Sequence, residues 1–329
     1  MKQRLLQAVQ CLGLMAQVWA GSGMIGSAHA AQAYPTKPIR MVIAFPPGGS
    51  NDIIARFVGV RLTHKLGQQI VYDYRGGAAG VIGTEIAARG IADGYTLLFA
   101  STSHTMIEAI RKVPYDTLGS FAPVAMFGRG PNVLVAHPNL PAKTFADLVP
   151  LAKASPGKFK YASTGIAGMH HFGGELLKHH AGIDLSHVAY KGGGPASFAV
   201  LSGEVEMMFS TMPLAMPNVR AGKLRALGVG GVARSPLLPA VPTLAEAGAP
   251  GYEFTVWWGL LAPRQTPAAI VSLLNTEVNT ILRDPEAAQQ LAAEGAQVTA
   301  LTPAQFGVML AETFNKWKKV AREANIRAE

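Results

Sequence analysis

The sequence predicts an α/β fold in two lobes, and three features of its 329 residues support this prediction. Short apolar runs alternate with segments that carry apolar residues at helical spacing. Two of the expected strands run directly into a glycine-rich loop and then a helix, at 45–51 and 163–170. Two apolar segments, 122–138 and 251–263, are suited to cross between lobes, so that lobe 1 takes 34–130 and 254–329 and lobe 2 takes 131–253.

The first 30 residues have the order of a secretory signal peptide. Lys2 and Arg4 precede a mostly apolar stretch that ends in small residues, and we expect cleavage after Ala30, with Ala33 as the alternative site. A retained membrane anchor is the competing interpretation, but three glutamines interrupt the apolar run, and no unbroken apolar segment of about 20 residues follows. The sequence therefore predicts a soluble, exported protein.

Cysteine content excludes several kinds of chemistry. The single cysteine, Cys11, lies inside the predicted signal peptide, so the mature chain has no thiol. It then has no disulfide, no thiolate metal site and no cysteine nucleophile. Removal of the signal leaves about 300 residues, which is enough for two domains of ordinary size.

The charge balance favours small anions over nucleic acid as the binding partner. The formal net charge is +9, but the basic residues are scattered, and the densest run, "KWKKVAR" at 316–322, lies in the last expected helix. A solvated helix face explains that run, because no basic stripe interleaved with aromatic residues accompanies it. A positive balance attracts anionic small molecules weakly.

The alternation of elements predicts parallel sheets with helices on both faces. Apolar runs predict strands near 41–45, 70–74, 96–101, 158–163, 186–192, 205–211, 224–231 and 254–263. Helical spacing predicts helices over 52–66, 80–90, 144–157, 169–182, 196–204, 216–222, 266–284, 284–295 and 302–324, with Gly67 and Gly90 closing the first two and Thr144 capping the third.

The two glycine-rich loops are candidates for anion binding. A helix N-terminus presents unpaired N–H groups and about half a positive charge, and glycines allow a ligand close to the backbone. Each loop alone has a simpler explanation as an ordinary strand-to-helix turn, with Ser50 or Asn51 as the cap. Their matched placement in the two lobes favours a clamp for an anion with two ends, such as a dicarboxylate.

Enzymatic motifs are absent from the sequence. The first loop lacks the Gly-Lys-Ser/Thr ending of a P-loop, and Tyr161 stands where a serine nucleophile elbow needs glycine. The histidine pairs 170/171 and 179/180 lack the H-E-x-x-H spacing of a zinc site, so we expect no metal, no catalytic residue and no cofactor. A secreted α/β hydrolase that uses Ser50 or Ser163 is the remaining enzyme hypothesis.

Eight segments resemble one known family in order along the chain. They are "YPTKPIRMVIAFPPGGSNDIIAR", "GTEIAARGIADGYTLLFASTS", "VPYDTLGSFAPVA", "KYASTGIAG", "VAYKGGGPA", "RAGKLRALGV", "PAVPTLAEAG" and "WWGLLAPRQTP". Together they resemble the substrate-binding proteins of tripartite tricarboxylate transporters, the Bug family. The resemblance runs from about Tyr34 to the last helix.

This resemblance implies a type II periplasmic binding protein that closes on a carboxylate and delivers it to a membrane transporter. Each lobe is then a mainly parallel sheet flanked by helices, and the ligand lies in the cleft between lobes. We expect a monomer without nucleic-acid partners; a sensor subunit is the alternative role. The implied ligand-binding residues are Phe45, Pro47, Gly48, Gly49, Ser50, Asn51, Thr102, Ser103, Ser163, Thr164, Gly165, Ile166, Ala167, Gly168, Met169, His170, Gly192 and Ser210, with Tyr190 and Lys191 beside Gly192.

Departures from the usual family pattern suggest the ligand. Ser210 stands where relatives often have an aspartate that could pair with an ammonium group, and Ile166 and Met169 make the second loop more apolar. "DYRGGAAG" (73–80) replaces a more usual Asn-Arg-Pro-Gly version and affects only a turn. We therefore expect a carboxylate without an amine, such as an aromatic mono- or dicarboxylate like terephthalate. An aliphatic di- or tricarboxylate such as citrate is the alternative.

Overall fold

Strands form where the sequence has short apolar runs. The computed structural model describes residues 34–327, and from Pro35 onward these form one compact unit. The predicted signal peptide therefore lies outside the described residues. The strands are β1 (Ile39–Ile43), β2 (Ile70–Tyr74), β3 (Thr96–Ser101), β4 (Phe121–Ala136), β5 (Lys160–Ser163), β6 (Ser186–Ala189), β7 (Met207–Thr211), β8 (Arg225–Val229), β9 (Thr255–Pro263) and β10 (Gln297–Val298).

Helices occupy most of the connections between these strands. They are α2 (Ser50–Leu66), the 3-10 turn η1 (Ala78–Gly80), α3 (Val81–Ala88), α4 (Thr102–Ile110), α5 (Phe145–Ala154), α6 (Met169–Ala181), α7 (Gly193–Leu201), α8 (Met212–Arg220), α9 (Ala268–Arg283), α10 (Pro285–Ala293) and α11 (Pro303–Glu323). The side chain of Thr144 caps α5 as predicted, and Gly67 ends α2 in the left-handed conformation. Asp284 and Thr302 cap α10 and α11 in the same way.

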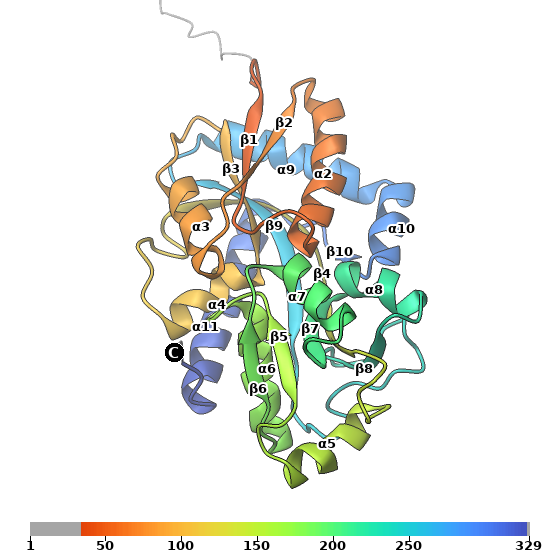
Figure 1. Cartoon of the computed structure of the whole chain (residues 1–329). Helices are drawn as coiled ribbons and strands as arrows, with labels where there is room; N and C mark the ends of the chain where they lie inside the picture. Colours follow the sequence, from red (N-terminus) through yellow and green to blue (C-terminus); the bar gives the residue numbers. More distant parts are fainter. Residues whose placement is uncertain (1–33, 328–329) are drawn as a thin grey trace, which may run out of the picture. The chain divides into compact units, whose positions relative to one another are not determined.

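The strands form one sheet with the order β2-β1-β3-β9-β4-β7-β5-β6, and β8 and β10 pair with β4 off this path. β1 pairs in parallel with β2 and β3, and β5 pairs in parallel with β6 and β7. The antiparallel strands β4 and β9 connect these two parallel sets, as Figure 1 shows. Phe121–Pro131 of β4 pairs with β9, and Asn132–Ala136 pairs with β7.

Two elements of the structure, β4 and α4, have no counterpart among the predicted strands and helices. The first apolar segment, 122–138, forms most of a single 16-residue strand, β4, because both halves find a partner strand. Helix α4 starts directly after β3 and has no counterpart among the predicted helices. Most of its nine residues are small or polar, and its buried apolar side chains are the adjacent Met106 and Ile107. This pattern is too short to detect by periodicity.

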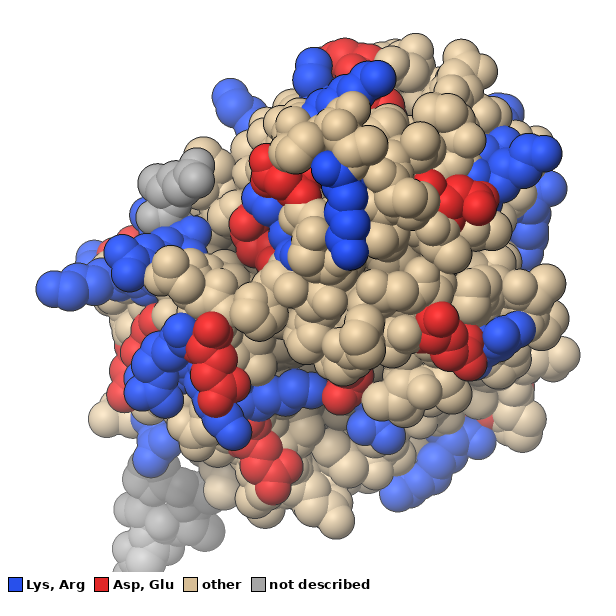
Figure 2. Space-filling model, turned by 90° about the horizontal axis from the view of Figure 1, so that it is seen from below, with Lys and Arg blue, Asp and Glu red and all other residues tan. Residues whose placement is uncertain are grey.

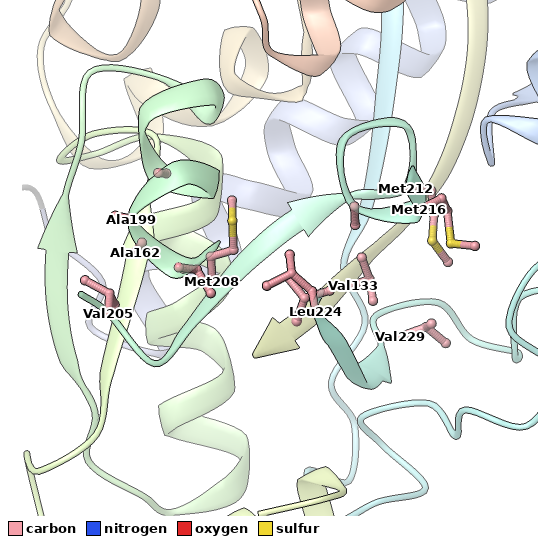
Figure 3. Close-up of a cluster of buried hydrophobic side chains, with 13 residues drawn as sticks. Val133, Ala162, Ala199, Val205, Met208, Met212, Met216, Leu224 and Val229 are labelled. Atoms are coloured by element: carbon pink, nitrogen blue, oxygen red, sulfur yellow. The ribbon is translucent and has the colours of Figure 1, made fainter. Parts of the chain in front are cut away.

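Each parallel set has its own apolar core. Around β1, β3 and β9, the buried side chains of Val42, Leu98, Trp257 and Leu261 pack against Phe306 of α11. Around β5 and β7, a separate cluster is rich in methionine and valine, as Figure 3 shows. Burial of this apolar area is the main source of stability, because the described residues contain no cysteine.

Charges of both signs are mixed over the surface. On the face drawn in Figure 2, Lys and Arg side chains lie among acidic and uncharged residues. Many of these charges pair locally, as Lys178 does with Glu175 and Asp184. None of the helices in residues 34–327 is both long enough and apolar enough to span a membrane.

His104 is a buried titratable group in the first parallel set. Its Nε2 lies 2.9 Å from the carbonyl oxygen of Thr117, and its ring packs edge-on against Phe121. Burial lowers the pKa of His104 to about 4, although the hydrogen bond with Thr117 opposes the shift. The folded protein therefore holds this ring neutral at pH values where the unfolded chain, with a pKa near 6.5, binds a proton.

We predict that stability falls as the pH is lowered from about 6.5 toward 4, since the unfolded state binds more protons in this window. His104→Gln keeps a donor for Thr117 but does not titrate. It should reduce the slope of the unfolding free energy by up to about 1.4 kcal/mol per pH unit. Urea unfolding at several pH values measures this slope, and equal slopes for both proteins would contradict the prediction.

Candidate functional site

A small pocket lies where the first turns of five helices meet. We call it the helix-start pocket. Its lining comes from the starts of α2, α4, α6, α7 and α8 and from the loop after β1. The lining residues are Phe45, Pro46, Gly49, Ser50, Asn51, Ser101, Ser103, Thr164, Met169, His170, Gly193 and Leu214. No Asp, Glu, Lys or Arg is among them, so the local charge comes from backbone dipoles.

All five of these helices lack a side-chain cap. The N-cap residues are Gly49, Ser101, Gly168, Gly192 and Thr211, and none accepts a hydrogen bond from its own helix. Ser50 and Asn51, expected as possible caps, are instead the first two residues of α2. By contrast, α5, α10 and α11 are capped by side chains and do not contribute to the pocket. The pocket thus collects N–H donors that lack an intrahelical acceptor.

Asp52 fixes the first loop to its helix. Its Oδ2 accepts a hydrogen bond from the Gly48 N–H at 2.9 Å, and its Oδ1 accepts from Arg56 at 2.6 Å and from Tyr74. Burial alone would raise the pKa of Asp52, but these hydrogen bonds outweigh it and lower the pKa. The carboxylate therefore stays charged and holds the loop that leads to Gly49 in place.

Several polar atoms at the pocket are buried without a hydrogen-bond partner among the described residues. They are Asn51 Oδ1, Ser103 Oγ, Thr164 Oγ1 and both ring nitrogens of His170. Leaving such atoms unsatisfied is costly, so their concentration in one place indicates a polar ligand or water. Burial lowers the pKa of His170 to about 4, and the ring is therefore neutral, with one donor and one acceptor nitrogen.

The pocket is nearly closed in this conformation. The space open to a water molecule is about 20 Å³, which is room for about one water. A second small cavity on the side of β3 shares Phe45, Ser101 and Ser103 with it. Pockets for organic ligands usually measure about 300–1,000 Å³, so a carboxylate larger than a few atoms needs the loops to move apart.

Glycine backbones close the pocket on one side. An added Cβ at Gly49 would lie 3.9 Å from the Gly193 nitrogen, and one at Gly192 would lie 2.6 Å from Cγ of Pro46. Gly192 also has a φ of +111°, which disfavours other residues. The left-handed residue of the first loop is Gly48, whereas Gly49 is extended. Close packing of the loop after β1 against the start of α7 thus depends on Gly192.

The structure brings eight of the predicted site residues together at the pocket and places the others around it. Phe45, Gly49, Ser50, Asn51, Ser103, Thr164, Met169 and His170 line it. Pro47, Gly48, Thr102, Ser163, Gly165, Ile166, Ala167, Gly168, Gly192 and Ser210 do not.

Outside the lining, Thr102 and Ser210 have other contacts that occupy their hydroxyls, and Ile166 is exposed. The Thr102 hydroxyl accepts from the Trp257 N–H, and the Ser210 hydroxyl donates to the carbonyl oxygen of Thr211. Ile166 is 47% exposed and does not supply the apolar contact expected of it. The apolar part of the lining comes instead from Phe45, Met169 and Leu214.

Sequence reasoning missed four lining residues, Pro46, Ser101, Gly193 and Leu214. Pro46 and Ser101 adjoin predicted residues, and Gly193 follows Gly192 in the motif "YKGGG". These three were accessible by extending each motif by one residue. Leu214 had no local signal, because its place depends on how α8 packs.

Ser163, one of the two serines of the hydrolase hypothesis, lies next to a histidine but outside the pocket. Ser163 is fully buried, and its Oγ lies 2.6 Å from His187 Nε2 and accepts from the Gly165 N–H. It does not line the pocket. Within residues 34–327 there is also no group of three or more His, Cys, Asp or Glu that could hold a metal ion.

The chain is similar to receptors of one transporter family. A family model described as the tripartite tricarboxylate transporter family receptor matches residues 54–326. Protein BugT of Bordetella pertussis is 36% identical over 313 residues, which cover 94% of this chain and 96% of BugT.

Solved structures show the same fold. Rpa4515 of R. palustris, solved with adipate, matches with a TM-score of 0.87 and 33% identity, over 89% of this chain and 99% of that one. MatC from Rhodopseudomonas palustris, solved with bound malate, matches with a TM-score of 0.83 and 29% identity, over 87% and 99%. These likenesses confirm the predicted α/β fold of the periplasmic binding protein class.

We predict that Gly192→Ala separates the loop after β1 from the start of α7. The added Cβ would collide with Pro46 and would be strained by the positive φ. Gly182→Ala is the matched control, because Gly182 also has a positive φ, +60°, but nothing lies within 4 Å of its Cβ position. Gly182→Ala should lose about 1–2 kcal/mol of stability from strain. Gly192→Ala should lose about as much or more, about 1–3 kcal/mol, because its φ of +111° and ψ of 176° are open essentially to glycine alone.

Only Gly192→Ala should also increase the radius of gyration in small-angle X-ray scattering, because only it removes the close contact. Equal scattering curves for the two variants would contradict this role of Gly192.

Proposed function

Since the chain belongs to the tripartite tricarboxylate transporter receptor family, we propose that it captures a small carboxylate in the helix-start pocket. It then delivers the carboxylate to a membrane transporter of the tripartite tricarboxylate type. The observation that carries this proposal is the convergence of five uncapped helix N-termini on one pocket without charged side chains. Each start contributes unpaired N–H donors and partial positive charge, which suit an anion.

A carboxylate without an amine fits this pocket best. An ammonium group needs an acidic partner once it is buried, and the lining contains none. The positive ends of the helices would also repel it. Phe45, Met169 and Leu214 supply apolar contact for the body of the ligand, and methionine adapts well to flat rings. We therefore favour an aromatic mono- or dicarboxylate such as terephthalate over citrate.

An aliphatic dicarboxylate is the second candidate. It is favoured by two relatives, one solved with adipate and the other with bound malate. Adipate has a flexible apolar body that Met169 and Leu214 would also accommodate. Its two carboxylates would use donors on opposite sides of the pocket, as those of an aromatic dicarboxylate would.

Capture and release require a hinge. We propose that 34–130 with 254–329 forms one lobe and 131–253 the other, and that β4 and β9 bend where they connect the parallel sets. Bound anion stabilises the closed form to the extent that it binds the closed form more tightly than the open form. In this proposal the protein acts as a periplasmic monomer rather than an enzyme. It is exported by its first 30 residues, and the intact mass of periplasmic protein tests that cleavage.

A thermal-shift panel tests the ligand class. It compares terephthalate, phthalate, benzoate and protocatechuate with adipate, malate, citrate, glutamate and aspartate. A ligand at 100 times its dissociation constant adds about 2.7 kcal/mol of stability, which for a protein of this size raises the melting temperature by about 5–10 °C. We expect shifts with aromatic carboxylates. Shifts with adipate or malate alone would support the second candidate, and shifts with only glutamate or aspartate would overturn both.

Thr164→Val tests whether the helix-start pocket binds the compound that gives the largest thermal shift. It removes a buried hydroxyl that has no partner and preserves the shape of the side chain. We expect affinity to fall by about 1–3 kcal/mol, the value of a hydrogen bond to a charged group. Thr211→Val is the control, since that hydroxyl is also buried without a partner but lies outside the lining. Equal affinity of the two variants in calorimetry would exclude Thr164 as a ligand contact.

A further inference from the structure

The loop that leads into α6 is held from behind by two histidines. Residues 163–168 connect β5 to α6 and carry Thr164 into the helix-start pocket. His171 comes from the first turn of α6, and His187 comes from the neighbouring strand β6. Neither lines the pocket. The inference below rests on the proposed function, because it concerns how this loop receives the ligand.

His187 fixes the beginning of the loop. Its Nε2 lies 2.6 Å from Ser163 Oγ, a hydrogen bond in which either atom can be the donor. The same Oγ accepts the Gly165 N–H at 3.2 Å. The imidazole therefore holds the Ser163 hydroxyl in position. The hydroxyl in turn holds the Gly165 amide, so the backbone is fixed both before and after Thr164.

His171 fixes the end of the loop. Its Nδ1 accepts a hydrogen bond from the Ala167 N–H at 3.3 Å. Ala167 is buried and has a φ of +64°, in the left-handed region that is unfavourable for a residue with a Cβ. A hydrogen bond at this amide stabilises the unfavourable conformation. It exists only while Nδ1 of His171 carries no proton, because a protonated nitrogen cannot accept.

The two imidazole rings act as one unit. The ring centroids of His171 and His187 are 4.2 Å apart, and their planes form an angle of 27°. The ring of Tyr161, from β5, also stacks on His187, with the centroids 5.1 Å apart. Two stacked imidazoles cannot both take up a proton without strong repulsion. Protonation of His171 at Nδ1 removes the hydrogen bond with the Ala167 N–H, whereas a charged His187 can still donate from Nε2 to Ser163 Oγ.

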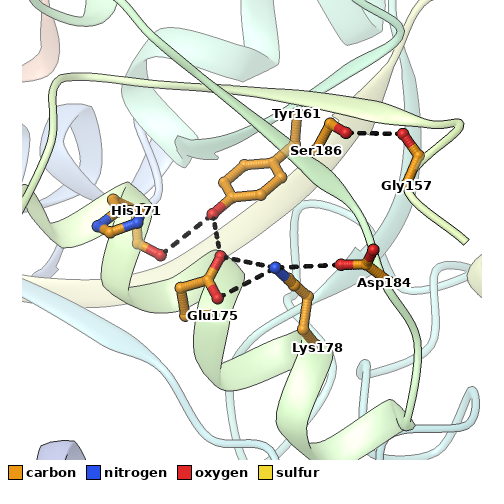
Figure 4. Close-up of polar contacts among 7 residues, drawn as sticks. All are labelled: Gly157, Tyr161, His171, Glu175, Lys178, Asp184 and Ser186. Atoms are coloured by element: carbon orange, nitrogen blue, oxygen red, sulfur yellow. Dashed lines mark hydrogen bonds and ion pairs between the residues drawn. The ribbon is translucent and has the colours of Figure 1, made fainter. Parts of the chain in front are cut away.

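Figure 4 shows three charged side chains near His171. Helix α6 contributes Glu175 and Lys178, and the segment before β6 contributes Asp184. Glu175 accepts from the Tyr161 hydroxyl at 2.8 Å, and Lys178 pairs with both carboxylates. His170 precedes His171 in the same helix.

These neighbours keep His187 neutral under ordinary conditions. Burial, followed by the charges of His171 and Lys178, lowers the pKa of His187 to about 4. Glu175 and Asp184 are paired with Lys178 and do not reverse this direction.

We propose that His171 and His187 are positioning residues for the ligand: together they hold loop 163–168 in its receiving conformation, and a proton on Nδ1 of His171 frees the Ala167 end of the loop and weakens carboxylate binding. The pair thus couples the affinity of the pocket to pH without touching the ligand. The strength of the coupling depends on how far the loop departs from this conformation when the hydrogen bond of Ala167 is lost.

Four variants separate positioning from general structure. His187→Leu removes the partner of Ser163, whereas His187→Gln places an amide near the position of Nε2 and does not titrate. His171→Asn similarly places an amide oxygen near the position of Nδ1. His179→Gln is the control, because His179 lies exposed on the same helix.

The first measurement needs no ligand. Hydrogen–deuterium exchange of the peptide that covers 163–170 should be at least several-fold faster in His187→Leu than in wild type at pH 7.5. His187→Gln, His171→Asn and His179→Gln should stay near the wild-type rate. Unchanged exchange in a folded His187→Leu protein would overturn the proposal.

The second measurement is the pH profile of affinity for the carboxylate that gives the largest thermal shift. Loss of one hydrogen bond in His187→Leu should weaken binding about five- to tenfold at pH 7.5. Between pH 7.5 and 4.5, wild type should lose affinity relative to the double variant His171→Asn/His187→Gln, which cannot titrate at these positions. This comparison cancels protonation of the ligand and of His170, which both proteins share.

The two proposals fail in different ways. If no carboxylate binds wild type at any pH, the proposed function is wrong, and the exchange experiment alone decides the role of the histidines. If wild type binds a carboxylate but its pH profile matches that of the double variant, the proposed function stands and the pair has no role in coupling.

Discussion

The constraint on which the structure depends is the meeting of five uncapped helix starts. Each start carries about half a positive charge and several N–H groups without an acceptor. Bringing five together without an acidic side chain is unfavourable in itself, since like partial charges repel and buried donors remain unpaired. An anion removes both costs at once. In the proposed function, closure of the pocket is therefore linked to anion binding through the backbone, because no charged side chain lines the pocket.

The topology explains why these starts meet. β1, β3, β5, β6 and β7 each lead into one of the five helices, and parallel strands direct their carboxyl ends to the same edge. Ligands of open α/β sheets bind beyond that edge. The antiparallel strands β4 and β9 join the two parallel sets, so that the edges of the two sets lie on opposite sides of one pocket. The site is thus a consequence of strand order more than of any single side chain.

Sequence reasoning identified the starts of α2 and α6, because glycine-rich loops after apolar strands are a local signal. It did not identify the start of α8, because β7 passes directly into α8 within "STMPL" (210–214) without such a loop. Leu214 reaches the pocket only through tertiary packing. His170 and His171 show the same limit. Adjacent in sequence, one has both ring nitrogens unpaired at the pocket and the other supports the loop from behind. The rotation of α6 about its axis decides which of the two histidines faces the pocket, and apolar periodicity in the sequence cannot fix that rotation to within one residue.

A pocket without charged side chains depends on the orientation of its backbone donors, so the groups that hold the two loops control affinity. The first loop is held by Asp52, whose hydrogen bonds keep its pKa low, and this support persists to acidic pH. The second loop is held by His171 and His187, and the bond from the Ala167 N–H to His171 requires an unprotonated Nδ1. If the proposed role of this pair holds, the second loop loses part of its support as the pH falls, while the first keeps its own. The two sides of the pocket then differ in their response to acid, although both present the same backbone chemistry.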